Sequence, residues 1–294
     1  MAGSGTTVLA SDVNTPYSTG VNIMGTGSAS RGYGQTTFGS AVTTSTIINA
    51  NDFNNIRYDL LNASAHQNGS AAALSIVASS GATVVTTDAT AFNSYQLTVD
   101  TDRFNCHSSR KTTASAGSNS RTSSWASSVT ATYTLNFASG DIARYFWNGG
   151  GRIRFASSRT GGAASAQNTS WSSLLSAAGT QEFGGSAVYG WGTGSTSLYS
   201  VSSSAPYASN TYSIAVSLNA AMGSATAFNF ALRWLDPYVD PMPGAPPLPE
   251  DIVDGTLSYS VEIVYPTGGH ALTPSGSWTS HSYSSFSAGA ITGG

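Results

Sequence analysis

The chain has 294 residues, and only 9% of them are Asp, Glu, Lys or Arg, where about 25% is typical of a globular domain. A formal net charge of -3 supplies no basic field for nucleic acid, no stretch reaches the ~18 apolar residues of a membrane span, and the single Cys106 excludes an intramolecular disulfide. The 40% hydrophobic content is enough for a packed core, so we expect a soluble, ordered protein.

The first 111 residues carry helical patterns with short apolar stripes. Asn51 and Asp52 can cap a helix that stops at Asn68-Gly69, and a second helix is predicted to open at Asp88. Each helix has one apolar face, so the two helices stabilise one another or a neighbouring subunit. We therefore expect region 1–111 to dock and oligomerise. Its interface candidates are Phe53, Ile56, Leu60, Phe92 and Tyr95.

Residues 112–124 are almost all Ser, Thr, Ala, Gly and Asn, which predicts a flexible linker. From 125 to 294, alternating apolar and polar residues between Gly- and Ser-rich turns predict an antiparallel, jelly-roll-like β-sandwich with one short helix near 170–178. The chain as a whole is predicted to be mainly β with a small helical N-terminal region. The predicted strands are 129–137, 152–156, 187–191, 212–218, 228–235 and 257–265.

Two further segments interrupt or follow the strands. Segment 236–254 holds most of the prolines and is predicted to be a stiff, irregular loop. Its acidic residues suit a bound calcium ion in type, but they match no calcium-loop consensus, and a solvated loop is the alternative. The polar tail after Pro266 is expected to be ordered only by a neighbouring molecule. The acidic residues of the loop are Asp236, Asp240, Glu250, Asp251 and Asp254.

The search for reactive groups yields no catalytic, cofactor-binding or metal-ligating set, so the sequence predicts a protein that is not an enzyme and needs no cofactor. The histidines have no ligand spacing, and His66, at the end of the first helix, is expected to have a capping or surface role. A polysaccharide-cleaving enzyme would need two facing carboxylates, and no convincing pair is found.

Arginines and aromatic residues are the remaining candidates for recognition. Alternation places Arg152 and Arg154 on one strand face, opposite Ile153 and Phe155. These arginines either pair with acids such as Asp141 between subunits or form an ordinary solvated face. The aromatic residues either stack on sugars or fill the sandwich core. They are Trp125, Tyr145, Phe146, Trp147, Trp191, Tyr199, Tyr207 and Trp234.

Five stretches lie in order between about residues 20 and 185: 24–35, 48–63, 66–69, 146–162 and 167–180. In order and wording they resemble virion structural proteins of tailed bacteriophages, especially phages of cyanobacteria and other aquatic bacteria. Members of this family are described as virion, tail or fibre-like structural proteins. The resemblance implies a place in the virion for a protein made in the host cytoplasm, and the N-terminus lacks the basic and apolar regions of a signal peptide.

The expected function is a non-enzymatic tail, neck or fibre subunit that contacts itself, with a trimer favoured, and other virion proteins. Two alternatives stay open: a capsid decoration protein, and a receptor-recognition module that binds a host surface glycan. Nucleic acid and membrane are not expected partners.

Overall fold

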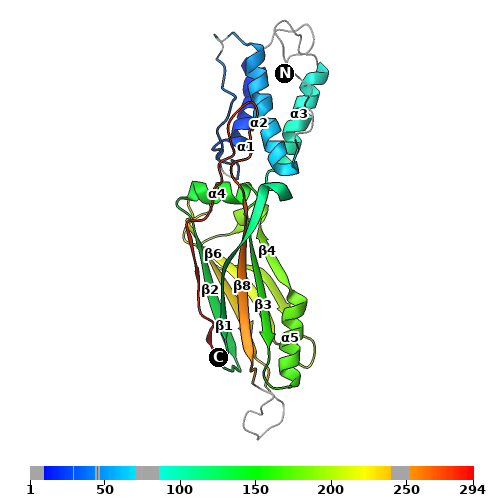
Figure 1. The fold of residues 1–294 in the computed structure, drawn as a ribbon, viewed down its shortest axis with the longest axis vertical. Helices are drawn as coiled ribbons and strands as arrows, with labels where there is room; N and C mark the ends of the chain where they lie inside the picture. Colours follow the sequence, from blue (N-terminus) through cyan, green and yellow to red (C-terminus); the bar gives the residue numbers. More distant parts are fainter. Residues whose placement is uncertain are drawn as a thin grey trace. The chain divides into compact units, whose positions relative to one another are not determined.

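Figure 1 shows the computed structural model of the chain, in which helices and two antiparallel sheets contribute almost equally, 30% and 32%. The chain is therefore mixed α/β and not mainly β, while the expected sandwich-like packing of two sheets is present. The described residues are 10–28, 30–43, 45, 47–70, 74, 86–239 and 252–294, with the backbone alone for 86–91.

The chain folds into two compact units, each assembled from separated pieces of sequence. Unit 1 combines residues 1–112, 141–151 and 265–282. Unit 2 combines residues 113–140, 152–264 and 283–294. This division differs from the predicted single boundary at 112–124, because two later segments return to the helical unit.

Unit 1 is built on three helices: α1 (Ala10–Met24), α2 (Ala50–Asn68) and α3 (Thr86–Thr101). The short helices η1 (Ser108–Arg110) and α4 (Gly140–Asn148) follow. We did not predict α1, which contains Pro16, or α4. Proline inside a helix is unfavourable, so burial of one face of α1 outweighs local preference there.

α2 begins and ends at residues that favour helix boundaries. The Asn49 side chain accepts a hydrogen bond from Asn51 N, and the Asp52 carboxylate accepts one from Asn49 N, which together form a capping box. Gly69 ends the helix at a φ of 84°, a left-handed conformation that favours glycine. The predicted helix is confirmed, with its cap slightly earlier than expected.

The apolar faces of α2 and α3 pack inside unit 1. The expected interface side chains of Phe53, Ile56, Leu60 and Phe92 are buried in its core, and Tyr95 packs partly buried against it. The helices thus bury their stripes within the chain and not on a neighbouring subunit. The reason for assigning particle docking to these five residues is removed.

Residues 265–282 complete the core of unit 1. Leu272 and Trp278 are buried there, and the Trp278 ring stacks on His66 with centroids 3.9 Å apart and an interplanar angle of 5°. The Gln35 amide donates to Thr279 O at 2.9 Å and accepts from Thr279 N at 2.7 Å. The expectation that only a neighbouring molecule orders the tail is therefore wrong, because this chain supplies the partners.

Unit 2 contains a four-stranded sheet in the order β1-β8-β3-β4 and a six-stranded sheet in the order β10-β2-β7-β6-β5, with β9 also on β2. The strands are β1 (Lys111–Arg121), β2 (Ser128–Asn136), β3 (Arg152–Thr160), β4 (Thr180–Gly184), β5 (Thr196–Ser202), β6 (Thr211–Leu218), β7 (Ala227–Leu235), β8 (Thr256–Pro266), β9 (Ser285–Ala288) and β10 (Thr292–Gly293).

Alternation along these strands separates an apolar inner face from a polar outer face. β2 buries every second residue from Val129 to Leu135, and β6 and β7 do the same. In β3, Arg152 and Arg154 alternate with buried residues such as Ile153. The strands predicted at β2, β3, β6, β7 and β8 are confirmed.

The helix α5 (Ala166–Ala178) lies beside the sandwich and contacts β3 and β5 (Figure 1). Its buried residues include Trp171, Leu174 and Leu175, and the Ser165 side chain caps its N-terminus. The short helix predicted near 170–178 is confirmed and begins at Ala166.

Three predictions for unit 2 are wrong. Most of the expected linker 112–124 is strand β1, because Ser, Thr and Ala fit a ladder with β8 despite their weak apolar contrast. The expected strand 187–191 overlaps the 3-10 helix η2 (Gly185–Gly190). The end of the tail, also expected to be ordered only by a neighbouring molecule, pairs with β2 of its own chain through β9 and β10.

The strand β5 has an irregular register on β6. The pairing shifts between Ser197 and Tyr199, as a β-bulge does. β5 forms one end of the described six-stranded order, and no charged residue occurs in it.

Replacing Trp278 with Ala tests whether the late segment stabilises unit 1. We expect a loss of about 3–5 kcal/mol in the free energy of unfolding, because the change removes a buried indole and leaves a cavity. Urea denaturation followed by helical circular dichroism measures it. Leu97→Ala, at a side chain that is 69% exposed, is the control and should change little. Equal, small losses in both variants would contradict the assigned role.

Candidate functional site

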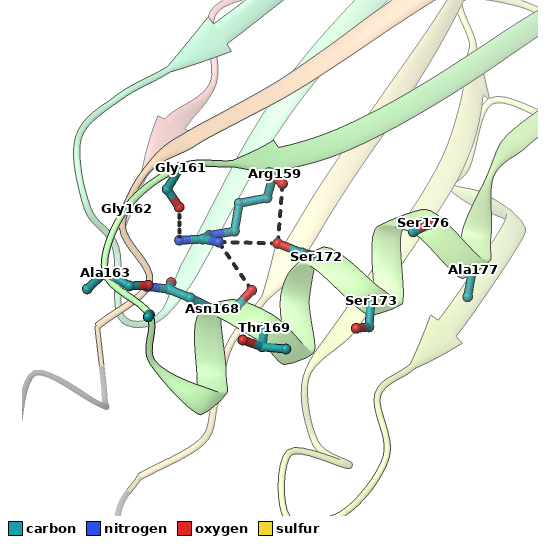
Figure 2. Close-up of a pocket in the computed structure, with 11 residues that line it drawn as sticks. Arg159, Gly161, Gly162, Ala163, Asn168, Thr169, Ser172, Ser173, Ser176 and Ala177 are labelled. Atoms are coloured by element: carbon teal, nitrogen blue, oxygen red, sulfur yellow. Dashed lines mark hydrogen bonds between the residues drawn. The ribbon is translucent and has the colours of Figure 1, made fainter.

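A groove of about 810 Å³ in unit 2 lies along α5 and the end of β3 (Figure 2). Small residues and hydroxyls dominate its wall. Among its described lining residues there is no carboxylate, imidazole or thiol. The lining residues include Arg159, Gly162, Thr169, Ser172, Ser173 and Ser176.

Arg159 is the one charged residue in this lining, and its guanidinium is directed at the protein itself (Figure 2). Nε donates to Asp254 O at 2.7 Å, and Nη2 donates to Gly161 O at 2.9 Å and lies 3.3 Å from Asp254 Oδ1. Nη1 donates at 3.2 Å to both Asn168 O and Ser172 Oγ. A guanidinium has five N–H donors, and these five contacts use them all.

Asp254 is the partner that joins this arginine to the start of β8. Its carboxylate accepts hydrogen bonds from Ala163 N at 3.0 and 3.1 Å and from the Asn168 amide. The hydrogen bond from Ala163, together with Asn168 and Arg159, holds the pKa of Asp254 below its usual value. The groove therefore rests on a saturated internal clamp. It leaves hydroxyls for non-covalent contact and supplies no nucleophile activated by a base.

Replacing Arg159 with Ala tests the clamp. The Arg159 side chain is only 5% exposed, so its removal leaves several buried carbonyls and the Asp254 carboxylate without a hydrogen-bond donor. We expect a loss of about 2–4 kcal/mol in the free energy of unfolding. Arg154→Ala, on the same strand but solvent-exposed, should cost under about 1 kcal/mol. Thermal unfolding of both variants checks the difference. Similar losses would contradict a structural role specific to Arg159.

The arginines on the outer face of β3 have acidic partners in their own chain. Arg154 Nε donates to Glu182 Oε2 at 2.6 Å, and its Nη1 lies 3.9 Å from Glu262 Oε2. Arg152 Nε lies 4.0 Å from Glu182 Oε1. We call these four residues the β3 charge cluster. Asp141, which the first alternative offered as a partner between subunits, pairs with Arg144 within α4 at 2.7 Å.

The aromatic residues considered for sugar stacking mostly fill the cores of the two units. Trp147 and Trp234 are fully buried, and Tyr199 is the least buried of the set. The core-filling alternative is thus confirmed for most of the set. The other buried members are Trp125, Tyr145, Phe146, Trp191 and Tyr207.

The acidic residues of the Pro-rich loop do not form one described cluster. Asp236 is buried and accepts a hydrogen bond from Gln167, while Asp254 belongs to the Arg159 clamp. Burial raises the pKa of Asp236 to about 6. Residues 240–251 lie outside the described part of the chain, so the choice between a bound cation and a solvated loop stays open there.

His66 is fully buried, so the expected surface position is wrong. Its Nε2 lies 2.8 Å from Gly149 O, which requires Nε2 to donate, and its Nδ1 has no hydrogen-bond partner among the described residues. Burial, with small contributions from His270 and Arg110, lowers the pKa of His66 to about 3. The imidazole is therefore neutral, and it serves as a packing surface for Trp278.

The pH dependence of stability tests this neutral state, with His66→Gln as the matched variant. The unfolded chain binds a proton on His66 near pH 6.5 and the folded chain does not, so acid favours unfolding. The advantage of the wild type over the variant should shrink by up to about 1.4 kcal/mol per pH unit between pH 6.5 and 4.

Burial also raises the pKa of Asp59 to about 6, so protonation of Asp59 in acid favours the folded state, opposite to the effect of His66. Asp59 is present in both the wild type and the variant, so its contribution cancels in their difference. Urea midpoints at stepped pH measure the difference. A difference that does not change with pH would contradict the neutral His66.

In the described part of the chain, no helix is both long and apolar enough to cross a bilayer, and no three His, Cys, Asp or Glu side chains gather where they could hold a metal ion. No protein-family model, curated protein or solved structure matches this chain.

Proposed function

We propose that the chain is a non-enzymatic structural subunit of a tailed-phage virion, acting in the tail, neck or fibre through contacts with its own copies and with other virion proteins. The resemblance over residues 20–185 supports the virion, and the surface chemistry of unit 2 supports assembly. A homo-oligomer is expected, with a trimer favoured.

The observation that carries this proposal is the character of the outer faces of the sandwich. Thr130, Thr132 and Thr134 occupy alternate positions of β2, and Ser213, Ala215 and Ser217 follow on β6. Such short, neutral side chains let another protein surface approach closely, at little cost in side-chain entropy or desolvated charge. Surfaces of this kind suit repeated contacts between identical subunits.

The polar side chains that bear charge support the same proposal. Arg159, Arg154 and Arg144 each lie beside an acid of their own chain. Pairs of this kind neutralise charge locally and lower the cost of covering a surface. In this proposal the sandwich, with the jelly-roll-like character expected of it, is the exposed or laterally packed part of the particle. The repeated crossing of the chain between its two sheets supports that finer description.

Copy number per particle and binding to host polysaccharide distinguish the two alternative functions from a tail, neck or fibre subunit. A capsid decoration protein would be present in hundreds of copies per particle, and a tail, neck or fibre subunit in tens or fewer. A glycan-recognition module would bind host polysaccharide. The mostly buried aromatic rings give that module little stacking surface among the described residues.

Native mass measurement of the purified protein, combined with quantification in purified virions, tests the proposal. We expect a homo-oligomer in solution and a low, fixed copy number relative to the major capsid protein. A strict monomer that is absent from virions would overturn the proposal. Release of oligosaccharides from host polysaccharide would overturn its non-enzymatic character.

A further inference from the structure

The β3 charge cluster is unusual in a chain with so few charged residues. The chain has three glutamates, and two of them, Glu182 and Glu262, lie directly beside Arg154 on the neighbouring strands β4 and β8. Their side chains are 43% and 49% exposed, and that of Arg154 is 35% exposed. The cluster is neutral overall, held by its own cross-strand contacts, and still open to a partner.

The cluster lies beside a region of short side chains on the same sheet. An open hollow of about 570 Å³ follows β1, β3 and β8, and its lining includes Ala156, Ser158, Ser258 and Ser260. Long, flexible side chains would keep a second backbone away from this region. Serine and alanine are short, so a second sheet can come close here at a small cost in side-chain conformational entropy.

The signs of the cluster alternate across the sheet. Glu262 on β8 is negative, Arg152 and Arg154 on β3 are positive, and Glu182 on β4 is negative. Neighbouring strands lie about 4.8 Å apart. A second identical sheet, related by a two-fold axis and displaced by about one strand, places the arginine row of one copy over a glutamate of the other.

The other sheet lacks this property. Among the described strands of the six-stranded sheet, the charged residue is Arg233 on β7, and those strands contain no acid to face it in a second copy. The apolar faces of α2 and α3 are already buried within unit 1.

We infer that the outer face of the four-stranded sheet is a self-complementary contact for a second copy of this chain, with the β3 charge cluster setting the register. The inference rests on the self-association of the proposed function, but a two-fold contact joins copies in pairs and so favours a dimer over the trimer. Charge pairs at an interface contribute orientation and exclusion of wrong partners more than affinity. The serine-rich region therefore supplies close approach, and the cluster supplies specificity.

The test uses charge reversal in the full chain. The variant Arg152→Glu with Arg154→Glu makes the cluster wholly acidic, and its homotypic dissociation constant should rise about tenfold or more, because like charges meet across the contact. The four-site variant that adds Glu182→Arg and Glu262→Arg swaps all signs and keeps the cross-strand pairs. It should associate with itself as the wild type does, because every facing pair keeps opposite signs. Arg233→Glu is the control and should associate normally.

Light scattering over a range of concentrations, and native mass spectrometry, read out these associations. Thermal unfolding confirms that each variant is folded, and the four-site variant decides the case if the two-site variant does not fold. An oligomeric wild type whose association is unchanged by the two-site reversal, or is lost in the four-site variant that restores the opposite charges, would overturn this inference and leave the homo-oligomer in place. A wild type that stays monomeric at every concentration would overturn the homo-oligomer and this inference together.

Discussion

The flat contact between Trp278 and His66 is the interaction on which unit 1 most depends. It joins a helix made early in the chain to a segment made near its end, and both rings are buried. The imidazole is neutral because burial excludes water, and the hydrogen bond to Gly149 O, which by itself raises the pKa of His66, fixes the ring orientation. Around it, Gln35 and Asn62 hydrogen-bond the backbone of the same late segment. The late segment is thus held in unit 1 by packing and neutral hydrogen bonds, with no disulfide available.

Unit 2 uses its few charges differently. Arg159 is buried and surrounded by carbonyl oxygens, so it stabilises one particular arrangement of β3, α5 and the start of β8. Arg154 is exposed and contacts carboxylates on both neighbouring strands. The two arginines lie on opposite faces of one strand, and burial decides their roles. The inner one fixes the fold, and the outer one is available for recognition.

Much of this fold could be predicted from residue patterns. In α2 and α3 the apolar residues recur at helical spacing, and in the central strands apolar and polar residues alternate. Prediction from these patterns failed where the two faces of an element differ little in polarity, or where a residue disfavours the element. β1 is made of Ser, Thr, Ala, Gly and Asn between its terminal Lys111 and Arg121, so its two faces look alike in sequence, and α1 contains Pro16. The partners of Arg154 could not be found either, because Glu182 and Glu262 meet it only through strand register. The ligands of Arg159 are mainly backbone carbonyls, which no side-chain motif reveals.

The bulge in β5 affects how readily this edge of the six-stranded sheet can pair with a strand of another chain. A sheet edge can recruit further strands into open-ended fibrils, and proteins commonly deter this with charges, prolines or bulges. β5 contains neither charge nor proline, so the register shift between Ser197 and Tyr199 is the deterrent it has. By twisting the edge, the bulge makes β5 a poorer template for a further strand.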